Sequence, residues 1–298
     1  MENEIQRLAP LIDPANQSAF RQHQRTWQSN RYVYPVVSRR SGGVSLGVNL
    51  NPDKVCNFDC IYCSVDRKLP GDLPEINLAV LRIELAHMLN SVINNEIFSH
   101  PVFSGVTPPL RRLNDIAFSG DGEPTSCPSL SACVQIAADE LALRHLTAVK
   151  IVLITNATLF HRPAVKSALE LMDRTNGEIW AKLDAGTAEY YRLIDRTTVP
   201  FERILENIKV AAQARPIVIQ TLFMRVHGMP PSPDEIIAYS GRLNAILKAG
   251  GKLKFVQIYT VARNPAEAFA SPLPLTELQA IASHIQELLP TLPVEVFP

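Results

Sequence analysis

Three of the five cysteines in this chain lie in one short segment, "VCNFDCIYC" (55–63), as Cys56, Cys60 and Cys63. Thiolates are soft ligands that suit zinc, copper(I) and iron–sulfur clusters. An odd number of cysteines, crowded in this way, does not resemble the disulfide framework of a secreted protein. We therefore predict that Cys56, Cys60 and Cys63 bind a metal centre.

The spacing of these cysteines also favours one kind of metal centre over another. A structural zinc site usually takes four ligands from two paired knuckles, and no second CxxC or HxxxH motif follows in this chain. A three-cysteine loop after a strand fits a [4Fe-4S] cluster in which the protein holds three irons and the fourth iron is open. The cluster is the favoured prediction, and a zinc-binding protein without turnover is the alternative.

Other polar residues follow apolar runs at several places in the chain. The stretch "FSGDGEPT" contains a Gly-rich turn at 120–123, although Gly-Asp-Gly is also common in ordinary turns. Thr155 and Asn156 end the run "LITNATL", and they would also suit a turn that caps a helix. Lys182 and Asp184 in "WAKLDAGT" lie on one strand face, where a buried charged pair is costly unless it is paired or functional. Weaker candidates by the same argument are Gln220, Thr221, Gln257 and Tyr259.

Apolar, β-branched runs alternate with amphipathic stretches from about residue 44 onward, which predicts alternating strands and helices. The predicted strands are 44–50, 115–120, 150–155, 178–184, 216–224 and 254–261. The predicted helices are 76–97, 128–145, 161–172, 200–214, 233–249 and 274–289, the last with Thr276 as its N-cap. Apolar strands separated by helices imply a parallel sheet buried on both faces. Six such units form either a partial barrel or an open doubly wound sheet, with ligands at the C-terminal ends of the strands.

The composition favours a globular protein without a strong preference for charged partners. Lys+Arg and Asp+Glu are equal at 29 each, so no global field attracts nucleic acid or a membrane. The N-terminus "MENEIQRLAP" lacks an apolar signal segment, and no run is long enough to span a bilayer. We expect a cytoplasmic monomer without a membrane partner. We also expect residues 1–43 to form an extension that packs on a single domain at 44–298.

The spacing Cys56-x3-Cys60-x2-Cys63, with Tyr62 directly before the third cysteine, resembles the signature of the radical S-adenosylmethionine (radical SAM) superfamily. The resemblance implies an α/β fold, a partial (β/α)6 TIM-like barrel, with a [4Fe-4S] cluster and SAM as cofactors. In that family the reduced cluster cleaves SAM to methionine and a 5′-deoxyadenosyl radical, which abstracts hydrogen. By this resemblance Cys56, Cys60 and Cys63 are the cluster ligands, and Tyr62 lies against the adenine.

The stretch "SGDGEPT" resembles the GGEP motif of the same family, with Asp121 in place of the second glycine. The resemblance implies that Gly120, Asp121, Gly122 and Glu123 contact SAM. Glu123 is the expected partner of the SAM ammonium group, because that role requires an acceptor. The further residues expected to bind the cofactors are Asn156, Lys182 and Asp184.

Over about residues 33 to 290, these motifs together with "VQIYTVARNPAE" look most like the wyosine-synthase-like (tRNA imidazoguanosine synthetase-like) group. That group implies tRNA or a nucleoside as the substrate and a flavodoxin- or ferredoxin-like reductant. Two observations disagree with the pattern of that group. Only Cys127 and Cys133 remain to bind a second cluster, and their spacing is not that of a cluster motif. The neutral net charge also gives little sign of a surface that binds tRNA. Three alternatives therefore stay open: a glycyl-radical activase, an enzyme acting on a peptide or small metabolite, and a non-catalytic cluster protein.

Overall fold

The structure, a computed structural model, describes residues 16, 20, 25, 27–72 and 75–298 of the chain. The chain folds as two compact units, each assembled from separate sequence segments. The first unit takes Met1–Asp53, Asp72–Leu153 and Ser167–Gly177, and the second takes Lys54–Gly71, Ile154–Lys166 and Glu178–Pro298. The predicted extension 1–43 lies partly outside the described residues, and its boundary stays a prediction.

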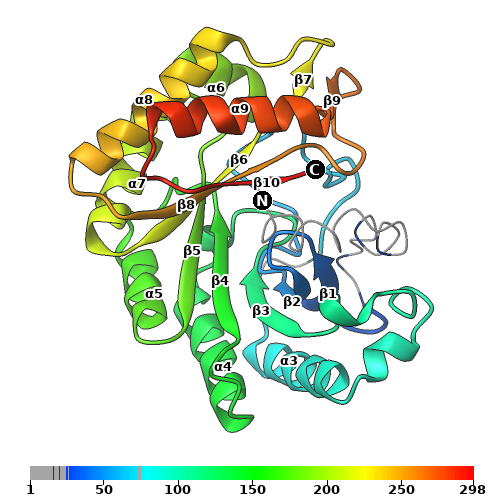
Figure 1. The fold of residues 1–298 in the computed structure, drawn as a ribbon. Coiled ribbons are helices and arrows are strands. Elements are labelled where there is room, and N and C mark those ends of the chain that lie inside the picture. The colour runs from blue at the N-terminus through cyan, green and yellow to red at the C-terminus, as the bar shows by residue number, and fades with distance from the viewer. Residues whose placement is uncertain (1–15, 17–19, 21–24, 26, 73–74) are drawn as a thin grey trace. The chain divides into compact units, whose positions relative to one another are not determined.

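The first unit is built on a run of neighbouring strands with helices packed beside them (Figure 1). In sheet order the strands are β1 (Val33–Ser38), β2 (Gly43–Val48), β3 (Leu113–Phe118) and β4 (Lys150–Thr155). Its helices are α3 (Leu78–Ile93) and α4 (Leu130–Leu143), with the short 3-10 helices η1 (Glu96–Ser99), η2 (Pro108–Leu110) and η3 (Pro124–Ser126). The first strand pairs antiparallel with the second, and the remaining pairs are parallel.

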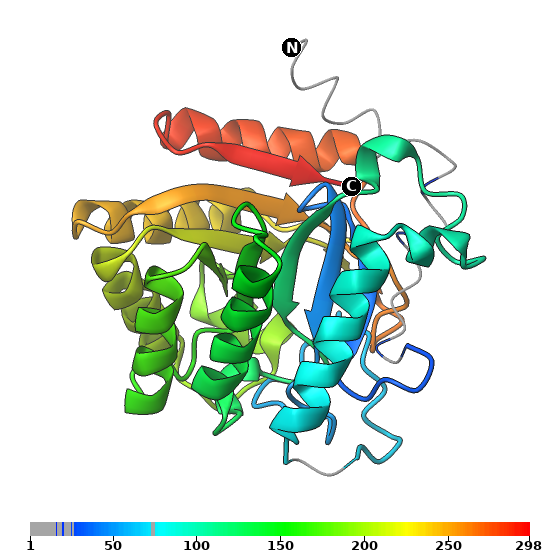
Figure 2. The same ribbon diagram turned by 90° about the horizontal axis from the view of Figure 1, so that it is seen from below.

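The second unit contains a parallel sheet with helices between its strands. In sheet order its strands are β5 (Gly177–Lys182), β6 (Ile217–Leu222), β8 (Leu253–Tyr259) and β10 (Val294–Phe297). A small antiparallel pair is formed by β7 (Arg225–Val226) and β9 (Ala270–Ser271). Its helices are α6 (Ala188–Asp195), α7 (Phe201–Ala214), α8 (Pro233–Lys248) and α9 (Leu275–Leu288), and α9 runs beside β10 (Figure 2). The helix α5 (Pro163–Asp173) begins in a segment of this unit and ends in a segment of the first.

The six predicted strands correspond to β2, β3, β4, β5, β6 and β8, and the six predicted helices to α3, α4, α5, α7, α8 and α9. The sequence reasoning missed β1, α6 and β10, and also the short pair β7 and β9 and the 3-10 helices. Pro35 lies within β1, and a proline demotes a run to an edge strand or a loop. The prediction that Thr276 caps the last helix is wrong, because Pro274 takes the N-cap position and Thr276 lies within the first turn.

Burial explains why the apolar runs became strands. Every residue of β2 and of β6 is buried, as expected for parallel strands covered on both faces. In α7 the buried apolar residues Phe201, Ile204, Ile208 and Ala211 recur at helical spacing and form one apolar stripe. Among the described residues, no helix combines the length and the apolar character needed to cross a membrane.

Polar residues inside the first unit are also tied to the backbone. Glu84 on α3 is buried, and its carboxylate accepts hydrogen bonds from the amides of Arg31 at 2.7 Å, Tyr32 at 2.8 Å and Val33 at 3.1 Å. A carboxylate that accepts several backbone N–H groups is strongly satisfied. The start of β1 is therefore held by a helix that follows it by about fifty residues in the chain.

A second buried carboxylate, Asp115 on β3, makes stability depend on pH. Its side chain is buried and accepts a hydrogen bond from the Ser45 hydroxyl on β2. Burial raises the pKa of Asp115 to about 6, although the bond from Ser45 opposes this shift. The folded state therefore favours the protonated carboxyl.

Replacement of this carboxyl tests its effect on stability. In the parent chain, the contribution of Asp115 is complete at pH below the ordinary value near 3.8 and is lost as pH rises through about 6, by about 3 kcal/mol. Asp115→Asn keeps an acceptor for Ser45 and should remove this part of the pH dependence. Urea unfolding between pH 4 and pH 7 measures the slope, and an unchanged slope would show that Asp115 is ionised in the folded chain.

Candidate functional site

The three cysteines of the predicted metal loop all belong to the second unit, in the segment between β2 and α3. All three cysteine side chains are of intermediate exposure, and the amide of Cys63 donates to the carbonyl of Cys60 at 3.0 Å. Across the described part of the chain, no three His, Cys, Asp or Glu side chains converge as ligands of a single metal ion. A [4Fe-4S] cluster does not require such convergence, because each thiolate binds a different iron.

The C-terminal end of α6 holds this cysteine loop by main-chain hydrogen bonds. The amide of Asp59 donates to the carbonyl of Asp195 at 3.1 Å, and the amide of Ile61 donates to the carbonyl of Ile194 at 2.9 Å. On the other side, the Ile61 carbonyl accepts from the amide of Glu267 at 3.0 Å. The last carbonyls of a helix have no partner within the helix, so the loop satisfies them. The backbone around Cys60 is thereby fixed on both sides.

A closed group of polar side chains holds the first half of the loop. Asn156, after β4, donates its Nδ2 to Asn57 Oδ1 at 2.8 Å. Asn57 in turn donates to the Thr158 hydroxyl at 2.7 Å, and the Thr158 amide donates to Asn156 Oδ1 at 3.1 Å. Asn156 was expected to bind a cofactor directly. In the structure its amide supports the residue that follows Cys56.

A buried ionic network lies at the carboxyl end of β5. The Lys182 ammonium is 3.0 Å from Asp184 Oδ2 and donates to the Tyr259 hydroxyl at 2.7 Å. The Tyr62 hydroxyl donates to the same Asp184 oxygen at 2.5 Å, and the other oxygen accepts from the Leu222 amide at 2.7 Å. The ammonium also lies 5.0 Å from the centre of the Tyr62 ring and 5.1 Å from that of Tyr259. The two charged side chains therefore meet, although Asp184 lies just after the end of β5, and they fix the orientation of Tyr62.

The environment of this network determines its protonation. Burial lowers the pKa of Lys182, but Asp184 and Tyr259 outweigh burial and raise it overall, so the amine stays an ammonium. Burial, followed by the Asp184 charge, raises the pKa of Tyr62, so its hydroxyl remains a hydrogen-bond donor. Burial and then Asp195 raise the pKa of the Cys60 thiol, which donates to Asp195 Oδ1 at 3.4 Å. Lys182 is therefore suited to act as a fixed positive charge.

The weaker candidates on the neighbouring strands extend this polar region. In the sheet, Lys182 is in register with Gln220 on β6, and Gln220 with Gln257 on β8. Gln220 donates its Nε2 to Gln257 Oε1 at 2.7 Å. Gln220 is fully buried, and its Oε1 has no partner within the described chain. This oxygen is an available acceptor for a ligand N–H or O–H group.

The Gly-rich turn belongs to the first unit, where it follows β3. A side chain at Gly120 would place its Cβ 2.8 Å from the Asn49 Cα, so only glycine fits there without displacement. Asp121 accepts from Asn49 Nδ2 at 2.7 Å and from the Arg25 guanidinium at 2.6 Å. The aspartate that replaces a glycine of the GGEP motif is thus tied to a strand end and to a basic side chain.

Glu123 in the same turn has a structural role that its sequence context did not reveal. It is 3% exposed and caps η3, accepting from the Thr125 amide at 3.0 Å and the Thr125 hydroxyl at 2.5 Å. Its carboxylate oxygen Oε1 takes both bonds. If Glu123 also accepts a hydrogen bond from a ligand ammonium, it must do so while its carboxylate still caps η3.

Sequence reasoning missed several residues of the site. Arg67 donates to Cys63 Sγ at 3.6 Å, and Glu235 on α8 accepts from the Thr187 hydroxyl at 2.6 Å and from the Gly186 amide. Glu235 thereby holds the turn that follows Asp184. An arginine four residues after one of the predicted ligand cysteines was a usable signal, since hydrogen bonds to sulfur tune clusters. The contact made by Glu235 joins distant segments and left no local signal.

Comparison with known families identifies the class of protein. The Radical SAM superfamily matches residues 50–238, and the chain belongs to this superfamily. Members of the superfamily are enzymes that use a [4Fe-4S] cluster and SAM. The expected enzyme class and cofactors are therefore confirmed. The matched residues include the cysteine loop, the Gly-rich turn and the Lys182–Asp184 pair.

Relatives with known sequences match at moderate identity. A Helicobacter pylori "UPF0026 protein" is 31% identical over 58% of this chain and 49% of its own length. A Brachyspira hyodysenteriae protein named "GTPase Obg" is 22% identical over 87% of this chain and 34% of its own length. The chain thus spans half or less of the length of these curated relatives.

Two solved structures share the fold. One, described as TYW1 with a lysine-pyruvate adduct bound, has a TM-score of 0.54 at 16% identity and covers 93% of this chain and 82% of its own. The other, a radical SAM methyltransferase from Sphaerobacter thermophilus, has a TM-score of 0.58 at 11% identity and covers 89% of this chain and 68% of its own. The predicted fold class, an α/β partial barrel of the radical SAM type, is confirmed.

Asn57→Ala tests the support of the cysteine loop. The substitution removes two side-chain hydrogen bonds, each contributing about 1 kcal/mol, so a chelator should strip iron from the reconstituted protein up to about thirtyfold faster. The decay of the visible absorption near ~400 nm measures this loss. Asn94→Ala, at the exposed end of α3, is the matched control and should lose iron at the parent rate. Equal rates in all three proteins would show that the Asn57 bonds do not hold the loop.

Proposed function

We propose that this chain is a radical SAM enzyme in which Cys56, Cys60 and Cys63 each bind one iron of a single [4Fe-4S] cluster. When bound, the cluster supplies the electron that cleaves SAM to methionine and a 5′-deoxyadenosyl radical, which abstracts hydrogen from the substrate. The observation that carries this proposal is the loop itself. Three cysteine thiols of intermediate exposure lie on one segment that α6 and Asn156 hold in place, within the part of the chain that matches the superfamily.

The chemistry of the donor set supports the proposal. Three thiols of intermediate exposure are accessible to iron, and the Arg67 guanidinium donates to one of the sulfurs. The main-chain bonds from α6 hold the loop backbone, so ordering the loop costs little additional entropy when the cluster binds.

Tyr62 and its partners are proposed to shape the SAM site. Asp184 accepts the Tyr62 hydroxyl, and the Lys182 ammonium lies over the same ring. A ring held in this way presents a fixed aromatic face, which suits stacking against the adenine of SAM. Gly120, Asp121, Gly122 and Glu123 are the proposed contacts of the SAM amino acid group, with Glu123 as the acceptor for its ammonium.

The substrate and partners follow less directly. Radical SAM enzymes need a reductant, and we propose a flavodoxin- or ferredoxin-like protein. The tRNA or nucleoside substrate stays a prediction that the likeness to TYW1 supports, and a peptide or small metabolite is the second prediction. A cytoplasmic location and a monomeric state likewise stay predictions. We propose no GTPase activity, because no GxxxxGK[ST] phosphate-binding motif occurs in this chain.

Cys60→Ala tests the cluster assignment. Loss of one iron ligand should abolish formation of 5′-deoxyadenosine in the presence of dithionite, while the circular dichroism spectrum stays unchanged because Cys60 lies on a loop. Chromatographic assay of 5′-deoxyadenosine provides the measurement. Cys127→Ala, a cysteine outside the loop, is the matched control and should retain SAM cleavage. A Cys60→Ala protein that still cleaves SAM would overturn the assignment.

Glu123→Gln separates the two roles of Glu123. The amide keeps an acceptor for Thr125 but loses the negative charge, so the dissociation constant of SAM should rise about tenfold, as expected for loss of a hydrogen-bonded ion pair. The unfolding midpoint and the iron content should change little. Thr125→Val, which removes only the capped hydroxyl, is the control and should bind SAM normally. Normal SAM binding by Glu123→Gln would leave only the capping role.

A further inference from the structure

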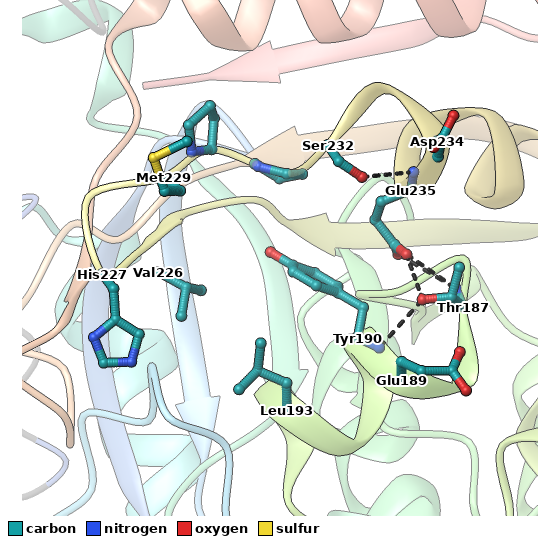
Figure 3. Close-up of a pocket in the computed structure, with 12 residues that line it drawn as sticks. Thr187, Glu189, Tyr190, Leu193, Val226, His227, Met229, Ser232, Asp234 and Glu235 are labelled. Atoms are coloured by element: carbon teal, nitrogen blue, oxygen red, sulfur yellow. Dashed lines mark hydrogen bonds between the residues drawn. The ribbon is translucent and has the colours of Figure 1, made fainter.

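A cavity of about 480 Å³ lies in the second unit, beside α6 and the N-terminal end of α8 (Figure 3). Its walls come from the segment that follows β5 and from the segment that follows β6. In α/β folds with parallel strands, ligands bind at the carboxyl ends of the strands. The volume is in the range of small-molecule sites, about 300 to 1,000 Å³. The position and the size therefore both suit a small ligand.

Tyr190 on α6 places an unused polar group in this cavity. Its ring crosses the cavity, and its hydroxyl points toward the turn that carries Val226 and Met229 (Figure 3). The hydroxyl is buried and has no hydrogen-bond partner in the described chain. Burial and then the Glu235 carboxylate raise the pKa of Tyr190, so the hydroxyl keeps its proton and can donate it. A buried hydroxyl without a partner costs about 1 to 3 kcal/mol, which an acceptor on a ligand would recover.

The charge of the cavity wall is negative. Glu189 and Asp234 contribute carboxylates, and the lining residues that the structure describes include no lysine or arginine. Glu189 also pairs with Arg192 at 3.1 Å on the exposed side of α6. The ring of His227 is stacked on Phe269, with the ring centres 4.4 Å apart. An anionic ligand such as a phosphate would find no cationic lysine or arginine here, whereas a cation would find at least one carboxylate.

The remaining wall is apolar. Leu193 and Met229 are 44% and 69% exposed, and Val226 with two prolines completes this side. When a ligand covers these apolar side chains, the binding free energy becomes more favourable by about 25 cal/mol per Å² of apolar surface removed from water. A ligand that fits the cavity therefore combines an apolar body, a positive charge and a hydrogen-bond acceptor.

We propose that this cavity binds a small molecule with an apolar body and a protonated amine. The amine faces Asp234, because Glu189 is paired with Arg192, and an oxygen or nitrogen of the ligand accepts the Tyr190 hydroxyl. The same helix carries Tyr190 near its start and Asp195, the partner of the Cys60 thiol, at its end. The assignment of this molecule as the substrate rests on the proposed function, and it favours the small-metabolite prediction over RNA.

The test is a calorimetric titration of the full chain, without SAM, with three probes of one shape. They are 4-methoxyphenethylamine, the neutral 4-methoxyphenethyl alcohol and the anionic 4-methoxyphenylacetate. The amine should bind about tenfold more tightly than the alcohol, as one ammonium–carboxylate contact provides, and the acetate should bind least. Equal affinity for all three probes, or preference for the acetate, would overturn the proposal.

Two variants locate the binding. Asp234→Asn should weaken the amine about tenfold and leave the alcohol unchanged, since only the charge contact is lost. Tyr190→Phe should weaken the amine and the alcohol alike, by about fivefold, because it removes one donor. Glu170→Gln, an exposed carboxylate on α5 away from the cavity, is the control and should bind as the parent does. Amine binding that neither Asp234→Asn nor Tyr190→Phe changes would place the amine elsewhere and overturn the proposal.

The proposal and the proposed function fail separately. A chain that cleaves SAM but binds none of the probes overturns the cavity assignment and leaves the radical SAM proposal standing. A chain that binds the amine in the cavity but does not cleave SAM overturns the radical SAM proposal and leaves the cavity assignment standing. Binding of AMP at the affinity of the amine, lost in Tyr190→Phe, would assign the cavity to a nucleotide and overturn its assignment to an amine.

Discussion

The contact between the end of α6 and the cysteine loop is the constraint on which the candidate site depends. A loop with three ligand positions has many conformations, and only a few of them place the thiols for one cluster. The carbonyls of Ile194 and Asp195 remove most of that freedom by accepting main-chain hydrogen bonds from the loop. Because main-chain groups make the contact, it does not depend on the side chains at those positions.

The same helix connects the loop to the rest of the second unit. Glu235 on α8 holds the turn at Gly186 and Thr187, and Thr187 caps the start of α6 by accepting from the Tyr190 amide at 3.2 Å. The position of α6 is therefore set by a buried carboxylate at one end and by the loop at the other. The cavity beside Tyr190 and the thiols beside Asp195 are consequently held by one short element of eight residues.

Electrostatics define the other half of the site. Lys182 and Asp184 are buried together, and a buried pair is stable only when its remaining hydrogen bonds are satisfied. Tyr62, Tyr259 and the Leu222 amide meet that requirement. The pair therefore acts as a rigid support for the ring of Tyr62, which lies directly before Cys63 in the proposed SAM site. The orphaned Gln220 oxygen, next to Lys182 in the sheet, leaves one acceptor for a ligand.

Local pattern was sufficient for the cysteine triad, for the six strands and six helices that were predicted, and for the two-residue spacing of Lys182 and Asp184. Spacing along the chain carries each of those features: thiols within one loop, alternation within one strand, and apolar periodicity within one helix. Only the tertiary structure decided that Asn156 supports the loop and that Asp195 meets Cys60 across 135 residues of sequence. Those contacts join segments that no short-range pattern relates, because a hydrogen bond between distant residues forms only after the strands between them have paired.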